Sequence, residues 1–182
     1  MARKKDLILR TKFAERLCHW FLVICFFFTA TSGLSWFYPS LSWMSNLLGS
    51  PQLARVLHPF LGIVVFLALC FMLVKFAKYN LFAKTDLIWF RKVTGVVANR
   101  HDEKLQIGKY NAGQKVLFWL IMTAILVLLV SGLIMWRAYF AHLFPIPVLR
   151  LAILAHAMAG IGLILLILGH IYLAIWVRGS IT

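Results

Sequence analysis

Four long apolar runs constrain the fold of this chain more than any other feature of its sequence. A helix needs about 20 predominantly apolar residues to cross a bilayer, and the runs at about 13–37, 53–76, 116–136 and 148–177 all reach that length. A chain of 182 residues suits one domain. We therefore predict that residues 1–182 form one all-α integral membrane domain, a bundle of four transmembrane helices. The first run is too long for a cleaved signal peptide and is predicted to be retained.

The distribution of basic residues predicts the orientation of the bundle. Residues 1–16 and the stretch 75–115 carry fifteen lysines and arginines, whereas the other two loops carry only Arg55, Arg137 and Arg150. Positively charged loops stay in the cytoplasm, so both termini and the loop 77–115 are predicted to be cytoplasmic. Within that loop, residues 85–97 fit a short helix lying in the headgroup region. The net charge of +14 is explained by lipid headgroups and topology and not by nucleic acid.

The three cysteines exclude several kinds of site. Cys18, Cys25 and Cys70 all lie inside apolar runs, and no CxxC pair exists. A disulfide framework, a zinc site and a cysteine-ligated iron–sulfur cluster are therefore not expected. A covalently attached haem of the CxxCH type is also excluded, because Glu15 stands where the first cysteine would be.

Four of the six histidines fall inside the apolar runs, where ionisable residues are uncommon and are candidates for function. His58 and His156 both lie roughly 10–12 Å in from the outer side, at a rise of about 1.5 Å per residue. His19 and His170 both lie near the cytoplasmic side. Depth therefore predicts an outer pair, His58 with His156, and an inner pair, His19 with His170.

The fourth apolar run carries one histidine of each pair. His156 and His170 are fourteen residues apart, which places them about 40° apart around the helix and about 21 Å apart along it. Two imidazoles on one side of a helix, each facing an imidazole of another helix, suit two stacked b-type haems in a bundle core. Any one of these histidines is equally well explained as a polar residue bonded to a neighbouring helix. Glycines in all four runs would leave room for a porphyrin, although each one alone also fits close helix packing. They are Gly33, Gly62, Gly132, Gly160, Gly162 and Gly169.

The histidines stand within motifs that are similar to a known family. The chain resembles the cytochrome b (gamma) subunit of bacterial respiratory formate dehydrogenase, and the resemblance extends over nearly its whole length. It is carried by Arg10-Thr11-Lys12-Phe13, Cys18-His19-Trp20, Gly49-Ser50-Pro51-Gln52, Leu57-His58-Pro59-Phe60, Gly108-Lys109-Tyr110-Asn111-Ala112-Gly113-Gln114-Lys115, Leu129-Val130-Ser131-Gly132 and Gly179-Ser180-Ile181. The sequence departs from the family pattern at Ala138, where proline is familiar, and relatives continue past the position of Ile181 into a charged tail.

The resemblance implies a function and a set of partners. It implies axial ligation of an outer haem b by His58 and His156 and of an inner haem b by His19 and His170. It also implies a subunit in the bacterial inner membrane that anchors an iron–sulfur (beta) subunit and a molybdenum- or tungsten-containing catalytic (alpha) subunit on the outer side. Electrons would pass from the iron–sulfur subunit through the outer and then the inner haem to menaquinone or ubiquinone. The chain would not oxidise formate by itself.

The resemblance also implies a quinone site at the cytoplasmic side, formed by Asn111, Gly113, Gln114 and His170. These residues could hydrogen-bond a quinone carbonyl. Protons taken up there, and a proton released from formate outside, would separate charge without a proton channel. Without the resemblance, Asn111 to Gly113 would be interpreted as a simple turn before the third span. Arg55, Arg137 and Arg150 fit equally well as partners of haem propionates or as headgroup anchors.

Three alternatives remain open from the sequence. The nearest is a dihaem cytochrome b that anchors a hydrogenase or another periplasmic oxidoreductase, which co-purified partners would distinguish. A transporter or metal channel lined by histidines, or a haem-free scaffold, would be colourless. No aspartate or glutamate in the middle of the spans supports a permeation path.

Overall fold

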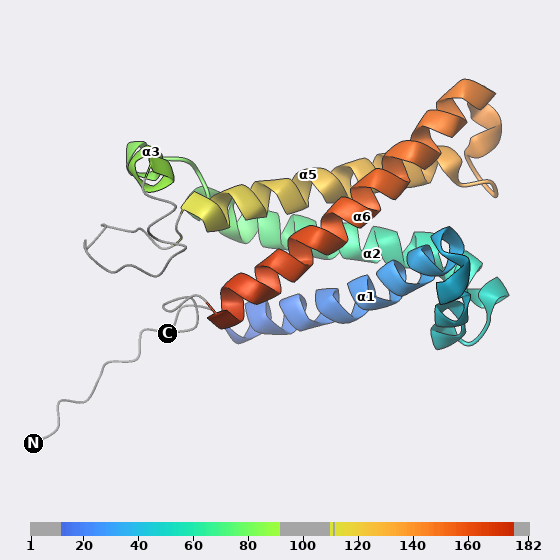
Figure 1. The fold of residues 1–182 in the computed structure, drawn as a ribbon, viewed down its shortest axis with the longest axis horizontal. Helices are drawn as coiled ribbons and strands as arrows, with labels where there is room; N and C mark the ends of the chain where they lie inside the picture. The colour runs from blue at the N-terminus through green and yellow to red at the C-terminus, as the bar shows by residue number, and fades with distance from the viewer. Residues whose placement is uncertain (1–11, 92–109, 111, 177–182) are drawn as a thin grey trace, which may run out of the picture.

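The computed structural model describes residues 12–91, 110 and 112–176. Four of the helices in these residues are long and apolar enough to cross a membrane. They are α1 (Phe13–Phe37), α2 (Pro51–Phe76), α5 (Ala112–Met135) and α6 (Ile146–Trp176). The prediction of an all-helical fold with four long apolar helices is confirmed. Figure 1 shows the chain reversing direction from each of these helices to the next, with the start of α1 and the end of α6 at the same end of the bundle.

Several helix boundaries differ from the apolar runs because polar and proline residues set them. α2 begins at Pro51 and not at residue 53. The Ser50 hydroxyl accepts the N–H of Leu53 at 3.1 Å, and proline at the first helical position loses no needed hydrogen bond. α5 begins four residues before the predicted span, and α6 begins at Ile146, two residues early.

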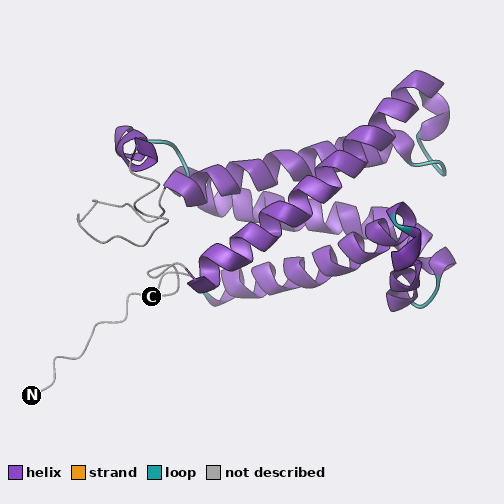
Figure 2. Cartoon of the chain, in the orientation of Figure 1, coloured by secondary structure: helices purple, strands orange, loops and turns teal. Residues whose placement is uncertain are grey.

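Short helical segments connect the spans, and Figure 2 shows helix as the dominant structure throughout. η1 (Pro39–Leu48) follows α1, and η3 (Ala141–Leu143) lies between α5 and α6. The chain leaves η1 at Gly49, whose φ of 97° favours glycine. η2 (Ala77–Tyr79) and α3 (Lys84–Arg91) follow α2. A short helix was predicted near α3, and the part of that prediction beyond residue 91 lies outside the described residues.

Two polar contacts hold the α2–α3 connection against α5. Lys115 Nζ lies 2.8 Å from Asp86 Oδ2, and both side chains are only 9% exposed. The same carboxylate oxygen accepts the N–H of Ala83 at 2.6 Å. Trp119 Nε1 donates to the carbonyl of Asn80 at 3.0 Å. These contacts fix the start of α5 beside α3.

The helices pack as two pairs that meet around an apolar core. α1 packs along α2 and α5 along α6, while α2 with α5 and α1 with α6 touch less extensively. The core cluster takes buried residues from all four helices, namely Cys25, Val65, Leu69, Ile125 and Leu163. Leu163 is only 1% exposed. Cys25, Val65 and Leu163 lie six or seven residues from the membrane histidines of their own helices, or roughly 10 Å along a helix. The core therefore separates the outer pair from the inner pair.

Candidate functional site

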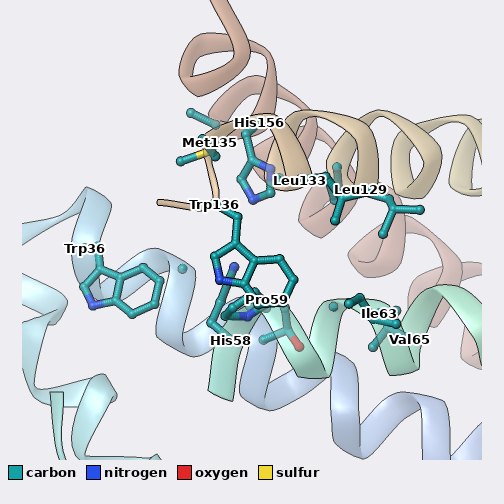
Figure 3. Close-up of a pocket in the computed structure, with 18 of the residues that line it drawn as sticks. Trp36, His58, Pro59, Ile63, Val65, Leu129, Leu133, Met135, Trp136 and His156 are labelled. Carbon is teal, nitrogen blue, oxygen red and sulfur yellow. The ribbon is translucent and has the colours of Figure 1, made fainter. Parts of the chain in front are cut away.

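The outer histidine pair lies between the two helix pairs of the bundle, with one ring from each. His58 on α2 and His156 on α6 have ring centroids 6.2 Å apart, with their planes inclined at 57°. Figure 3 shows both imidazoles pointing into one cavity, with Trp36 and Trp136 beside them. The Trp36 ring lies 5.0 Å from the His58 ring, edge to face. The structure therefore brings together the two histidines that depth assigned to the outer pair.

The inner pair has nearly the same geometry at the other end of the bundle. His19 on α1 and His170 on α6 have ring centroids 6.4 Å apart, with an interplanar angle of 53°. His170 is exposed and His19 is half-buried. α6 thus supplies one imidazole to each pair, as its fourteen-residue spacing predicted.

The spacing within each pair fits two ligands of one metal ion. Two imidazoles on opposite sides of a metal have ring centroids about 6.3 Å apart, because each metal–nitrogen bond is about 2.0–2.1 Å and the nitrogen lies about 1.1 Å from the ring centre. The observed 6.2 and 6.4 Å agree with this value. No group of three or more His, Cys, Asp or Glu side chains that could hold a metal occurs in the described residues. A pair of imidazoles would suit haem, whose porphyrin would supply the other ligands.

A cavity of about 720 Å³ surrounds the outer pair and is lined by all four spans. This volume lies within the range of pockets that hold cofactors, about 300–1,000 Å³. Its wall is mainly apolar, with Leu163 of the core on it. Arg55 and Arg137 also line it, so two positive charges are available to anionic groups of an occupant.

Four of the six glycines in the predicted spans fall into two kinds. A Cβ on Gly33 would lie 3.5 Å from His58 Cε1, and a Cβ on Gly132 would lie 3.2 Å from His156 Cε1. These two glycines admit the imidazole rings. Gly62 and Gly162 have nothing within 4 Å of such a Cβ, so close helix packing does not account for them. Open space at Gly62, which lines the cavity, fits a group held between the helices.

A serine hydroxyl lies within hydrogen-bonding distance of each outer imidazole. Ser32 Oγ lies 2.8 Å from His58 Nδ1, and Ser131 Oγ lies 3.0 Å from His156 Nδ1. Because Nδ1 is bonded in both rings, Nε2 is the nitrogen left to bind a metal. A hydrogen bond to the far nitrogen is typical of histidines that ligate metals. Together with the cavity and the spacing, these bonds show that the outer site fits a haem.

The predicted quinone residues are placed only in part. Gly113 and Gln114 lie in the first turn of α5, and His170 lies near the end of α6. Figure 1 shows these helix ends at the same end of the bundle. Asn111 lies outside the described residues. Lys115, which follows Gln114, is the residue that pairs with Asp86.

Sequence reasoning missed Ser32, Ser131 and the ion pair of Asp86 with Lys115. A Ser-Gly step precedes His58 by 26 residues, and another precedes His156 by 25. That recurrence was the available signal. The ion pair had none, because its residues lie 29 positions apart in a loop and a span. Of the two loop histidines, His142 lies in η3 and His101 is outside the described residues.

Comparison with known proteins gives one consistent result. The family described as prokaryotic cytochrome b561 matches residues 10–180. The cytochrome b556(Fdn) subunit of nitrate-inducible formate dehydrogenase from Escherichia coli K12 is 51% identical over 98% of this chain and 82% of its own length. The cytochrome b556(fdo) subunit of formate dehydrogenase from the same organism is 42% identical, over 99% and 84%. The formate dehydrogenase cytochrome b556 subunit of Haemophilus influenzae is 45% identical, over 96% and 73%.

Proposed function

We propose that this chain holds two haems b and carries electrons across the membrane to a quinone. The premise is that it belongs to the prokaryotic cytochrome b561 family and is a cytochrome b556-type membrane subunit of formate dehydrogenase. Membership of the family implies haem b, and a subunit of formate dehydrogenase implies partner subunits. The number of haems, their ligands, the electron path and the acceptor belong to the proposal.

The observation that carries the proposal is the repeated pairing of imidazoles at 6.2 and 6.4 Å across the bundle. His58 and His156 would hold the outer haem, and His19 and His170 the inner haem. Bound haem b supplies a one-electron Fe(III)/Fe(II) couple at each position. The apolar core between the pairs excludes water and keeps the two levels separate. The four spans therefore act as a rigid frame for two relay positions along one path.

The partners are inferred from the relatives and from the charge distribution. The orientation predicted by the basic residues puts the outer pair toward the periplasm and both termini in the cytoplasm of the bacterium. An iron–sulfur subunit and a molybdenum- or tungsten-containing catalytic subunit would then dock at the outer end and deliver electrons there. Arg55 and Arg137 line the outer cavity and are available to pair with haem propionates. The names of the relatives favour formate dehydrogenase over a hydrogenase as the enzyme served.

The quinone would be reduced at the cytoplasmic end. His170 lies there in an exposed position, and Gly113 and Gln114 begin α5 at the same end. Backbone and amide groups of this turn, with Asn111, would bind the quinone carbonyls. Proton uptake at this end, with proton release from formate on the opposite side, would store energy across the membrane.

Haem analysis of purified protein with histidine variants tests the proposal. A pyridine haemochrome assay should find two haems b per chain. His58→Ala and His156→Ala should each lose the outer haem and retain the inner one, while His19→Ala should lose the inner haem. His142→Ala is the matched control, because His142 lies in η3 outside both pairs, and should retain both haems. Protein without a Soret band would refute the proposal, and loss of only the inner haem from His58→Ala would refute the pairing.

A further inference from the structure

The outer site is built from two equivalent halves. Each half takes a Ser-Gly step from one helix and a histidine from the next, Ser32-Gly33 on α1 with His58 on α2, and Ser131-Gly132 on α5 with His156 on α6. In both halves the serine oxygen meets Nδ1 and the glycine lies against Cε1 of the same ring. The two halves coincide with the two closely packed helix pairs, α1 with α2 and α5 with α6.

The direction of these hydrogen bonds follows from the serine's single proton. Ser32 Oγ lies 2.7 Å from the carbonyl oxygen of Phe28, and Ser131 Oγ lies 2.6 Å from that of Val127. A carbonyl can only accept, so each hydroxyl donates its proton to the backbone. The serine oxygen is then an acceptor, and a hydrogen bond from the imidazole to it requires the ring proton to be on Nδ1. That tautomer leaves the Nε2 lone pair free for iron.

The inner pair lacks this support. In the part of the chain that the structure describes, no hydrogen bond to the ring of His19 or His170 is found. Each outer ring meets a serine hydroxyl and also a backbone group, that of Thr29 for His58 and that of Leu128 for His156. The two sites therefore share their ring spacing but differ in the hydrogen bonds that the described residues make to the rings. A hydrogen bond accepted from Nδ1–H makes an imidazole a more basic ligand. A more basic ligand donates more electron density to iron and favours the ferric state.

Building on the proposed haem function, we propose that Ser32 and Ser131 are positioning residues that fix the outer imidazoles in the Nδ1–H tautomer and thereby lower the midpoint potential of the outer haem. Their hydroxyls do not touch the haem and act through the ring of each ligand. Lowering the outer potential favours electron transfer inward, toward the pair for which the described residues provide no such bond.

Redox titration of the full complex, purified with both haems, tests this inference. Ser32→Ala and Ser131→Ala should each raise the midpoint potential of the outer haem and leave the inner haem unchanged. We expect a change of up to about tenfold in the ferric to ferrous ratio for each variant, which is about 59 mV for a one-electron couple. The EPR signal of the ferric outer haem should shift as well. The haem that is absent from His58→Ala identifies the outer signal.

Two further variants separate the hydroxyl from other effects. Ser35→Ala is the matched control, because the one hydrogen bond of its hydroxyl within the described residues goes to the carbonyl of Ser32, at 2.6 Å, one turn along the same helix. It should leave both potentials unchanged. Ser32→Thr keeps a hydroxyl and should retain a potential near that of the unaltered protein.

Each outcome decides the inference. Retention of both haems with an unchanged outer potential in the two alanine variants overturns it. If the alanine variants lose the outer haem, retention of that haem by Ser32→Thr supports the positioning role, and its loss from the threonine variant overturns the role at Ser32. Absence of two haems from the unaltered protein would instead refute the proposed function, so the two failures are distinguishable.

Discussion

Gly132 provides the sharpest test of how the His156 ring is held. In Gly132→Ala the new Cβ would lie 3.2 Å from His156 Cε1 and 3.6 Å from its Nδ1. Carbon atoms in ordinary contact are about 3.5–4.0 Å apart, so the imidazole must move by a few tenths of an ångström. Ser131 holds the same ring at 3.0 Å. The ring therefore cannot move without disturbing that bond or changing the orientation of the ring across the cavity.

The magnitude follows from the cost of overpacking. An extra methyl group in a well-packed site costs about 1–3 kcal/mol. If that cost falls on the ligand geometry, the affinity for the outer haem should decrease by about 5- to 150-fold, since 1.4 kcal/mol is a factor of ten. Gly33→Ala should be milder, because its Cβ would meet His58 Cε1 at 3.5 Å, an ordinary contact. Gly162→Ala should have no effect, because nothing lies within 4 Å.

Haem transfer to an excess of apomyoglobin measures this series. The outer haem should leave Gly132→Ala first, Gly33→Ala later, and Gly162→Ala at the rate of the unaltered protein. The inner haem should be lost at one rate in all four proteins, which controls for general unfolding. Equal retention of the outer haem by Gly132→Ala and Gly162→Ala would refute the idea that Gly132 makes room for the ligand ring.

Two predictions concern stability. Burial alone would raise the pKa of Asp86, but the hydrogen bonds from Lys115 and the Ala83 N–H, with the charge of Lys115, outweigh it and hold the pKa below its usual value. This carboxylate therefore stabilises the fold above the ordinary aspartate pKa, near 4, and the stabilisation is lost as the pH falls through the lower folded value. Asp86→Asn should lower the thermal midpoint of unfolding at pH 7. The difference in midpoint between the variant and the unaltered protein should be smaller near pH 3, and a difference that does not change with pH would contradict this. Leu163→Ala should destabilise the bundle by about 2–3 kcal/mol in an unfolding assay. This is toward the low end for core truncations, because lipid is already apolar. Leu165 on the same helix is 63% exposed, so Leu165→Ala should have little effect in the same assay.

Depth in the membrane could be predicted from the sequence because it depends on helix rise alone. Counting residues from the ends of the apolar runs grouped His58 with His156 and His19 with His170, and the structure brings the same residues together. The fourteen-residue spacing on α6 likewise fixed two imidazoles on one side of that helix. Whether the four histidines ligate iron stays a prediction.

The polar contacts between helices could not be predicted in this way. Ser32 reaches His58, and Asp86 reaches Lys115, only because of how each helix is rotated and which neighbour it packs against. Hydropathy and residue spacing contain neither quantity. The two kinds of glycine show the same limit, since Gly33 and Gly62 both suggested room for a cofactor. Only the structure shows the His58 ring against Gly33 and open space at Gly62.

The sequence by itself determined the number of spans and the level of each histidine, because both follow from the length and rise of single helices in an apolar medium. The tertiary structure alone decided which polar atoms meet across helices, since that depends on rotation about each helix axis and on the packing of α1 with α2 and of α5 with α6.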